Sequence, residues 1–384
     1  MNIEIQSFDP SDSPRRQEFI DFPYEHYSHL RAKEDALWIP PLRMSQEKLL
    51  DPNKSVFLKS AKLRLFLAKN RGKTIGRIAA IQNSAHDTYH RNQETGFYGF
   101  FESIEHTETA RQLFMAAGGW LKASGYSRMV GPVNPSVHHE CGLLIRGQSQ
   151  HPTIGTTWNP KYYVDLHEKN GLTPTKDLVA YAIRVEHDSI LSDHKKKVEQ
   201  DARQNQRIRF RDFRLTQFER DAEICFEIYN RAWERNWGFY QLDRTLFLEL
   251  ARDITPILDP RFAFIAEVNQ KPAGFMLALP DINHLLKHIP DGRLFPTGWL
   301  KLSLGRPFLK SVRIITLGVS PEYRHLGIFT AFTQESFRRA RKHGVIGGEA
   351  SWILEDNDAM TRPWEELGAP LYRRWRLYEQ NLTD

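Results

Sequence analysis

Cysteine, long apolar runs and a strong charge imbalance are all missing from this sequence. Only two of the 384 residues are cysteines, Cys141 and Cys225. That is too few for a disulfide framework, and the pair lacks the spacing of a zinc site. We therefore expect no metal and a reducing, cytoplasmic location. No run approaches the ~18 apolar residues that a membrane helix needs, and residues 1–17 lack the apolar core of a signal peptide.

The charge balance is mildly basic, with 53 lysines and arginines against 47 acidic residues. The densest basic stretch, residues 195–214, ends in an alternating segment in which Arg207, Arg209 and Arg211 share one side of a strand. This pattern is typical of a solvated strand face, so we do not expect a nucleic-acid partner. A small anionic ligand suits the same charge.

A weak internal repeat divides the chain into two similar halves. Gly171 in the first half corresponds to Gly368 in the second, and Tyr181 corresponds to Tyr378 at the same separation. Around each pair, a short helix ends at the glycine, as helices prefer, and a strand follows. Self-similarity of this kind indicates two copies of one α/β unit.

The second half has a clear order of expected elements. After a strand at 207–213 come helices over 217–235 and 244–255, where apolar residues recur at helical spacing. A hairpin follows over 261–280, with its turn near Asn269 and Gln270. A strand at 312–318, a long helix, another strand, a short helix and a final strand complete the half. In the first half, 63–83 is the matching hairpin and 96–103 the matching strand.

The segment Arg324-His325-Leu326-Gly327 joins the strand at 312–318 to the long helix. The first N–H groups of a helix have no intrahelical partner, and the helix dipole makes that end positive. A glycine there lets an anion approach the backbone, and Arg324 adds positive charge. The alternative is an ordinary strand-to-helix turn with a surface arginine.

This order of elements, with its R-x-x-G segment, resembles the GNAT superfamily of acyl-CoA acyltransferases. The stretches GPVNPS, ECGLLI, WNPKYY and ALPDIN further resemble a bacterial group of two-domain GNAT-like proteins. The resemblance implies an α/β fold with a mixed sheet, built as two tandem GNAT-like domains. We expect a degenerate domain over 1–190, a linker over 191–206 and an acyl-CoA-binding domain over 207–384. The first half has no R-x-x-G segment between Glu102 and Gly125, so only the second is expected to bind the cofactor.

The resemblance assigns the cofactor, a coenzyme A thioester carrying an acetyl or longer acyl group, to the second half. The family holds it near the end of the strand at 312–318, at the R-x-x-G segment and at the end of the next strand. The corresponding residues here are Leu317, Gly318, Val319, Arg324, His325, Leu326, Gly327, Ile328, Phe329 and Asn357. Phe329 departs from the family pattern, which has a glycine or alanine at that place. Its ring either narrows the pyrophosphate site or points into the core.

Acyl transfer to an amine needs a base for the amine proton and gains from an acid for the leaving thiolate. Glu355 is the expected base, with Glu349 as an outside candidate; the neighbouring Asp356 suits a helix cap better. The family's acid is a tyrosine at the place where this chain has Trp364. Tyr372 and Tyr378 are the nearby replacements, although strand tyrosines often serve only packing.

Four further residues are candidates for contact with the acceptor: Asn134, His139, Glu140 and Trp237. The first three belong to a segment that equally suits a plain turn. The aromatic stripe that includes Trp237 equally suits the core. Residues 294–310 mix aromatic, leucine and basic side chains, as does a lid, an interfacial segment that meets lipid, or a packed surface loop.

The function we expect is acyl-CoA-dependent N-acyltransfer by direct attack of an amine on the thioester. The acceptor is expected to be a small-molecule or lipid-like amine bound between the domains. One alternative is a non-catalytic protein of the same fold that senses CoA or another anion, which Phe329 and Trp364 favour. Another is a transferase that takes its acyl group from aminoacyl-tRNA, whose binding would be sensitive to salt. The sequence does not define the oligomeric state.

Overall fold

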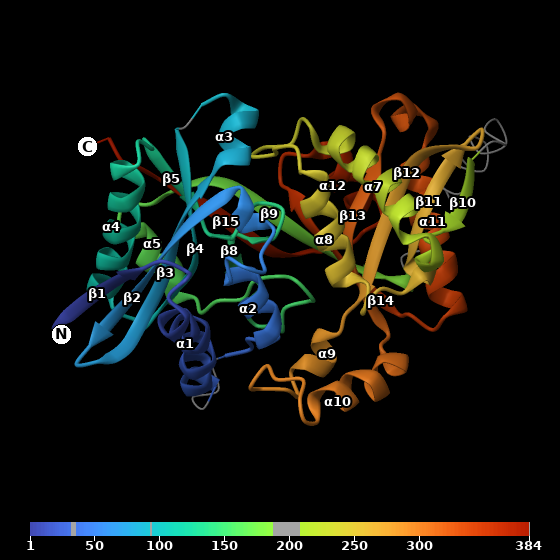
Figure 1. The fold of residues 1–384 in the computed structure, drawn as a ribbon. Coiled ribbons are helices and arrows are strands. Elements are labelled where there is room, and N and C mark those ends of the chain that lie inside the picture. Colours follow the sequence, from blue (N-terminus) through green and yellow to red (C-terminus); the bar gives the residue numbers. More distant parts are fainter. Residues whose placement is uncertain (32–35, 93, 187–207, 384) are drawn as a thin grey trace. The chain divides into compact units, whose positions relative to one another are not determined.

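The computed structural model describes residues 1–31, 36–92, 94–186 and 208–383 (Figure 1). The chain forms two compact units, each a mixed α/β assembly around a sheet. Unit 1 contains Met1–Asp177, Asn283–Leu304 and Arg373–Asp384, and unit 2 contains Leu178–Ile282 and Gly305–Tyr372. The expected linker over 191–206 lies outside the described residues. No helix in the described part of the chain is long and apolar enough to cross a membrane.

The first half of the chain supplies most of unit 1. Its strands are β1 (Ile3–Phe8), β2 (Ala61–Asn70), β3 (Lys73–Asn83), β4 (Thr95–Ser103), β5 (Arg128–Gly131), β6 (Val133–Asn134), β7 (Glu140–Cys141), β8 (Leu143–Arg146) and β9 (Thr173–Arg184). Its helices are α1 (Ser13–Arg31), α2 (Arg43–Leu50), α3 (Ser84–His90), α4 (Thr107–Ala123) and α5 (Tyr162–Glu168), with a 3₁₀ turn at Phe57–Lys59.

The second half repeats this order. Its strands are β10 (Ile208–Asp212), β11 (Ala263–Val268), β12 (Lys271–Pro280), β13 (Ser311–Val319), β14 (Gly347–Leu354) and β15 (Leu371–Asn381). Its helices are α7 (Phe218–Trp233), α8 (Arg244–Ile254), α9 (Asn283–Leu286), α10 (Gly298–Gly305), α11 (Ile328–Lys342) and α12 (Asp358–Glu366). The 3₁₀ turns are η3 (Leu215–Gln217), η4 (Pro260–Phe262), η5 (Arg306–Phe308) and η6 (Pro321–Leu326). The expected helices over 217–235 and 244–255 are thus confirmed to within two residues at each end.

Both predicted hairpins are present. In the second half, Asn269 and Gln270 both have positive φ, at 51° and 66°, and connect β11 to β12. In the first half, Arg71 and Gly72 do the same for β2 and β3, at 51° and 76°. Two-residue hairpin turns need this left-handed backbone to match the twist of the strands, which explains why the turn recurs in both copies.

Each sheet ends with a strand from the other half of the sequence. In unit 1 the strand order is β1-β2-β3-β4-β5-β15, with β8 also paired to β15. In unit 2 the order is β9-β14-β13-β12-β11-β10. Residues 178–184 of β9 therefore complete the sheet of unit 2, and residues 373–381 of β15 complete that of unit 1. Compact units and sequence repeats thus divide this chain in two different ways.

The core of unit 2 lies on both faces of its sheet, because side chains alternate along each strand. Phe264, Ala266 and Val268 of β11 pack with Phe332 of α11 on one face. Ile265, from the same strand, packs with Cys225 and Ile228 of α7 on the other face. In unit 1, α4 packs on the sheet through Leu113, Phe114 and Ala117.

Candidate active site

The two central strands of unit 2 separate before either of them ends. β13 and β14 run parallel and pair from Ser311↔Gly347 to Ile314↔Ala350. Beyond that point their pairing stops, although β13 continues to Val319 and β14 to Leu354. An irregularity in the β12–β13 register falls at the same level, between Leu277 and Ala278, and a bulge of this kind bends a strand. Beyond Ile314, the backbone groups of β13 on the side of β14 therefore have no ladder partner in β14.

Polar and small residues line the diverging part of β13. Thr316 Oγ1 is buried and has no hydrogen-bond partner among the described residues. Gly318 lies against α7, where an added Cβ would come within 2.4 Å of the Trp233 ring. Glycine at 318 therefore allows α7 to lie close to the end of β13.

The segment after β13 has the expected strand-to-helix geometry. Residues Pro321–Leu326 form the 3₁₀ turn η6, and Gly327 then adopts φ +67° and begins α11. No heavy atom lies within 4 Å of the Cβ position of Gly327, and no side chain caps the helix N-terminus. The first N–H groups of a 15-residue helix are thus left without a side-chain acceptor at an open glycine, which is the arrangement that suits an anion.

Arg324 has contacts that its sequence position did not predict. Its guanidinium donates to the carbonyl oxygens of Ala232, at 2.9 Å, and Val319, at 3.3 Å. These bonds join the end of α7 to the end of β13. The neighbouring His325 is exposed. In this structure Arg324 therefore supports the walls of the candidate site.

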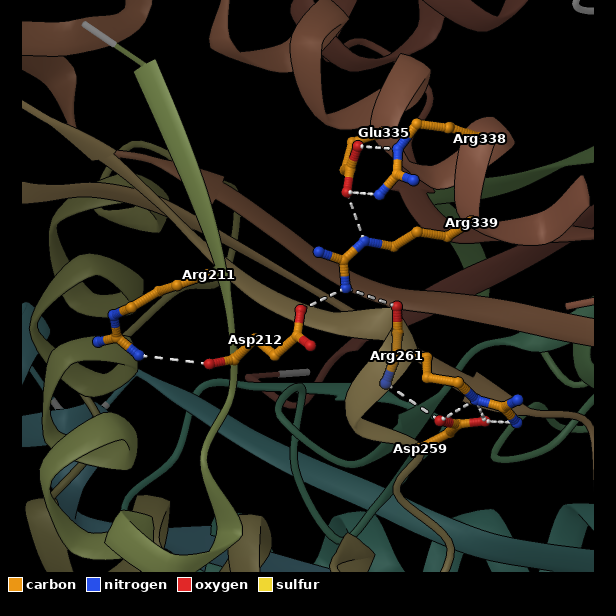
Figure 2. Close-up of polar contacts among 7 residues, drawn as sticks. All are labelled: Arg211, Asp212, Asp259, Arg261, Glu335, Arg338 and Arg339. Atoms are coloured by element: carbon orange, nitrogen blue, oxygen red, sulfur yellow. Dashed lines mark hydrogen bonds and ion pairs between the residues drawn. The ribbon is translucent and has the colours of Figure 1, made fainter. Parts of the chain in front are cut away.

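A buried arginine fixes the far end of α11 (Figure 2). Arg339 Nη1 donates to Asp212 at 2.6 Å and to the Arg261 carbonyl at 2.9 Å, while its Nε donates to Glu335 at 2.7 Å. Glu335 also accepts two bonds from Arg338. Because Asp212 ends β10 and Arg261 lies in η4, the network connects α11 to two other elements of unit 2.

The two residues that depart from the family pattern contact each other. The Phe329 and Trp364 rings lie with centroids 5.6 Å apart, at an interplanar angle of 70°. Trp364 is only 2% exposed and belongs to a core cluster with Tyr181 and Phe337. Trp364 is therefore a core residue, and the Phe329 side chain packs against that core. The Phe329 ring thus does not point toward the place where the α11 N-terminus would meet an anion.

A buried polar cluster lies beside the point where the strands separate. Glu349 of β14, 1% exposed, accepts hydrogen bonds from the Ser351 and Tyr372 hydroxyls. Arg313 of β13 lies 3.8 Å from the Glu349 carboxylate, and its Nε donates to Ser351 Oγ at 2.9 Å. Arg313 and Glu349 face each other because they are register partners. Tyr372 is only partly buried, so its hydroxyl connects a buried carboxylate to a more accessible position.

The other expected catalytic residues lie elsewhere. Glu355 is exposed and directly follows β14. Asn357 is the N-cap residue of α12, without a side-chain capping bond. Tyr378 lies in unit 1, fully buried, and donates to Glu168 at 3.1 Å. Sequence reasoning ranked Glu349 below Glu355, although an acidic residue inside the otherwise uncharged strand GGEASWIL was a usable signal.

In unit 1 two parallel strands also stop pairing before they end, but another strand of the same unit, β6, lies beside the unpaired part of β4. β4 and β5 pair from Thr95↔Arg128 to Phe97↔Val130, while β4 continues to Ser103. β6 occupies the space: the Val133 carbonyl oxygen lies 1.6 Å from the Cβ position of Gly99. Asn134 Oδ1 accepts from the Phe100 N–H at 2.6 Å.

The remaining acceptor candidates divide between the two units. His139 and Glu140 follow β6 in unit 1, where His139 bonds Ser136 at 2.8 Å and burial lowers its pKa to about 4. Glu140 pairs with Asn134 across the small β6–β7 ladder. Trp237 is partly buried just after α7 in unit 2. Within the described ranges, no group of three His, Cys, Asp or Glu side chains is placed to hold a metal.

Comparison with known proteins agrees with this geometry. The model of the Acetyltransferase (GNAT) family matches residues 222–369, from α7 through α12. A tandem GNAT protein from the clavulanic acid biosynthesis pathway has a similar structure, with a TM-score of 0.56 and 12% identity, covering 100% of this chain and 99% of its own. A GCN5-related N-acetyltransferase from Sphaerobacter thermophilus gives 0.51 and 14%, covering 100% and 96%. This chain belongs to the GNAT family, as a tandem-domain member.

Two relatives match over nearly the whole chain. The bacterial ceramide synthase of Caulobacter vibrioides is 30% identical over 361 residues, which cover 92% of this chain and 93% of that protein. Protein YghO of Escherichia coli K12 is 31% identical over 379 residues, covering 95% and 92%.

Proposed function

We propose that this protein transfers an acyl group from a coenzyme A thioester to an amine, and that unit 2 binds the thioester. The main support for the proposal is the arrangement of β13, β14 and α11. The parallel pair β13–β14 stops pairing at Ile314↔Ala350 beside a helix that begins at an open glycine. Membership of the GNAT family, which uses acyl-CoA donors, supports the same assignment.

The residues of unit 2 fit such a ligand. The N-terminus of α11 at Gly327, Ile328 and Phe329 would hold the pyrophosphate through backbone N–H groups. Leu317, Gly318 and Val319 would present β13 backbone to the extended part, and Thr316 Oγ1 offers a buried hydroxyl that has no partner among the described residues. Acyl-CoA, when bound, would supply an activated thioester carbonyl. A backbone N–H near Val319 would then stabilise the oxygen of that carbonyl as negative charge develops on it.

We further propose that Tyr372 and Glu349 move the amine proton. As the amine nitrogen bonds to the acyl carbon and the carbon–sulfur bond breaks, one proton must leave nitrogen and one must reach the thiolate. Tyr372 can accept the first proton while passing its own to Glu349, because its hydroxyl already donates to that carboxylate. The relay then reverses: the Tyr372 hydroxyl gives a proton to the thiolate and takes one back from Glu349, which is ionised again. Glu355, at the end of β14, is the alternative base. A base in reach of the proton contributes roughly 10²–10⁴-fold to such a step.

The acceptor class that we propose is based on the relative that is named for its activity. A ceramide is an N-acylated long-chain amino alcohol, and the Caulobacter protein is named a ceramide synthase. We therefore propose a long-chain amino alcohol as acceptor, which belongs to one of the two acceptor classes expected from the sequence, the lipid-like amines.

Product detection by mass spectrometry tests this function. The protein is incubated with acetyl-CoA or a long-chain acyl-CoA, and with either a long-chain amino alcohol or a soluble polyamine. We expect an amide of the long-chain amino alcohol and no acylated polyamine. If CoA binds but none of the four mixtures yields a product, the chain is a CoA-binding protein of the same fold. If product appears only when charged tRNA replaces acyl-CoA, the donor assignment is wrong.

A further inference from the structure

Exposed apolar side chains concentrate in one short segment. Among the described residues, eleven large hydrophobic side chains are exposed, and five of them lie between residues 293 and 310. They are Phe295 at 73%, Trp299 at 44%, Leu300 at 41%, Leu304 at 70% and Phe308 at 79% exposed. Single exposed hydrophobic residues are ordinary, but four of these five, from Phe295 to Leu304, lie in one short stretch of unit 1, and such a group indicates a binding surface.

The same segment carries positive charge only. Residues 293–310 contain four basic side chains and no aspartate or glutamate: Arg293, Lys301, Arg306 and Lys310. Two of them bond backbone carbonyl groups, Lys301 to His288 at 2.7 Å and Arg306 to Pro256 and Leu258 at 2.8 and 2.6 Å. Carbonyl groups are neutral, so these bonds do not cancel the charge of either side chain, although the Asp259 carboxylate interacts electrostatically with Arg306.

The segment has a defined local structure. Trp299 N–H donates to the Leu294 carbonyl at 2.8 Å, and its indole Nε1 donates to Pro296 at 3.0 Å. Gly298 begins α10 in a turn so tight that an added Cβ would lie 2.4 Å from the Arg293 oxygen. Figure 1 shows this part of the chain in orange, from α9 to α10. The exposed side chains are therefore presented by an ordered turn and helix.

We propose that residues 293–304 of unit 1 bind the surface of an anionic lipid bilayer. Phe295, Trp299, Leu300 and Leu304 would enter the boundary between headgroups and acyl chains, while Arg293 and Lys301 would meet lipid phosphates. Apolar and aromatic side chains combined with lysines and arginines are the composition of interfacial helices, and anionic headgroups attract each such cation. This inference concerns where the protein binds and does not depend on the acyl-transfer proposal.

Co-sedimentation with sucrose-loaded vesicles tests the proposal on the full chain. Vesicles contain phosphatidylcholine alone or phosphatidylcholine with phosphatidylglycerol. We expect binding to the mixed vesicles, weakened at least tenfold in Phe295→Ser/Leu304→Ser, since burying one such side chain alone accounts for roughly that factor. Met115→Ser/Leu215→Ser is the control, because these residues are 61% and 41% exposed and belong to other elements, α4 and η3. Arg293→Gln/Lys301→Gln should weaken binding about fivefold per removed cation, only on the anionic vesicles.

Two further measurements decide between the membrane and other occupants. Lipids with brominated acyl chains should quench tryptophan fluorescence, and Trp299→Phe should remove most of that quenching. The proposal is overturned if the wild-type protein ignores both vesicle types, or if the serine variants and their controls bind equally. It is also overturned if the wild-type protein is a dimer by sedimentation velocity and Phe295→Ser/Leu304→Ser makes it monomeric, because a second copy would then cover the segment.

Discussion

The two units differ at the point where their parallel strands stop pairing. In each, a pair of parallel strands stops pairing after a few residues, at Phe97↔Val130 in unit 1 and at Ile314↔Ala350 in unit 2. Unit 1 inserts β6 there, and Asn134 bonds the Phe100 N–H. In unit 2 no strand of the described residues takes the corresponding place between β13 and β14. If unit 2 binds CoA as we propose, the duplicated fold has kept one ligand site and filled the other with its own chain.

A second difference concerns buried carboxylates. In unit 1, burial raises the pKa of Glu102, although Arg77, Tyr27 and Tyr163 oppose the shift. In unit 2, burial alone would raise the pKa of Asp221, but hydrogen bonds from Arg214 and Arg211 outweigh it and lower the pKa. The ionised form is therefore disfavoured by folding in the first case and favoured in the second.

The largest effect we predict is on stability. Asp221 is fully buried and accepts from Arg211 at 2.7 Å and from Arg214 at 3.1 Å. Asp221→Asn leaves both arginines without their carboxylate and should cost about 3 kcal/mol at neutral pH. Because the pKa of Asp221 is lower in the folded chain than in the unfolded chain, its ionisation stabilises the fold above the unfolded-state pKa of about 4. This stabilisation is lost as pH falls through the folded-state pKa. The deficit should therefore shrink in acid.

Glu102→Gln is the matched variant in unit 1 and should show the opposite trend. Because the pKa of Glu102 is higher in the folded chain than in the unfolded chain, its contribution to stability is fully present below the unfolded-state pKa of about 4.3. That contribution is lost as pH rises through the folded-state pKa. The difference in unfolding free energy between the variant and the wild type should therefore shift in favour of the variant as pH rises above about 4.3. Urea unfolding at a series of pH values measures both, and parallel pH trends in the two variants would remove this distinction between the units.

The next effect separates two tyrosines of β15. Tyr372→Phe in unit 2 removes the hydroxyl bonded to Glu349 and should lower kcat about 100-fold, with the affinity for CoA unchanged. Tyr378→Phe in unit 1 removes a hydroxyl bonded to Glu168 and should leave kcat within about twofold, because it changes a core contact of unit 1 only. Steady-state kinetics with calorimetric CoA binding checks both. Equal losses in the two variants would rule out a proton-transfer role for Tyr372, and Glu355→Gln then tests the alternative base of unit 2.

The smallest effect concerns two glycines. Gly99→Ala places a methyl group where the Val133 oxygen already lies, so unit 1 should lose roughly 1–3 kcal/mol. Gly327→Ala has free space but keeps φ +67°, and should cost only about 1 kcal/mol. Thermal unfolding of both variants compares them directly. A larger loss at Gly327 would mean that the start of α11 is more tightly enclosed than the open Cβ position indicates.

Sequence reasoning predicted the repeated elements well because each is encoded locally. The hairpin turns at Arg71–Gly72 and Asn269–Gln270, the helix after Gly327 and the order of strands all follow from short patterns. The exchange of β9 and β15 between sheets could not be predicted, because pairing between distant strands leaves no local signature. The insertion of β6 was missed for the same reason.

Parts of the candidate site were predictable and others were not. Gly327 predicted the start of a helix, whereas the contact between Phe329 and Trp364 is visible only in the folded structure. Glu349 was ranked low because a lone carboxylate in a strand reveals its value only when Arg313, Ser351 and Tyr372 are seen around it.

The central claim is that unit 2 alone binds CoA, through the N-terminus of α11. Calorimetric titration of CoA into the wild type, Gly327→Asn and Gly327→Asp tests it most directly. Both side chains tolerate a left-handed backbone, but only aspartate adds negative charge beside the anion site. We predict one CoA per chain, retained by Gly327→Asn and lost in a folded Gly327→Asp. Two CoA per chain, or equal binding by the two variants, would contradict the claim.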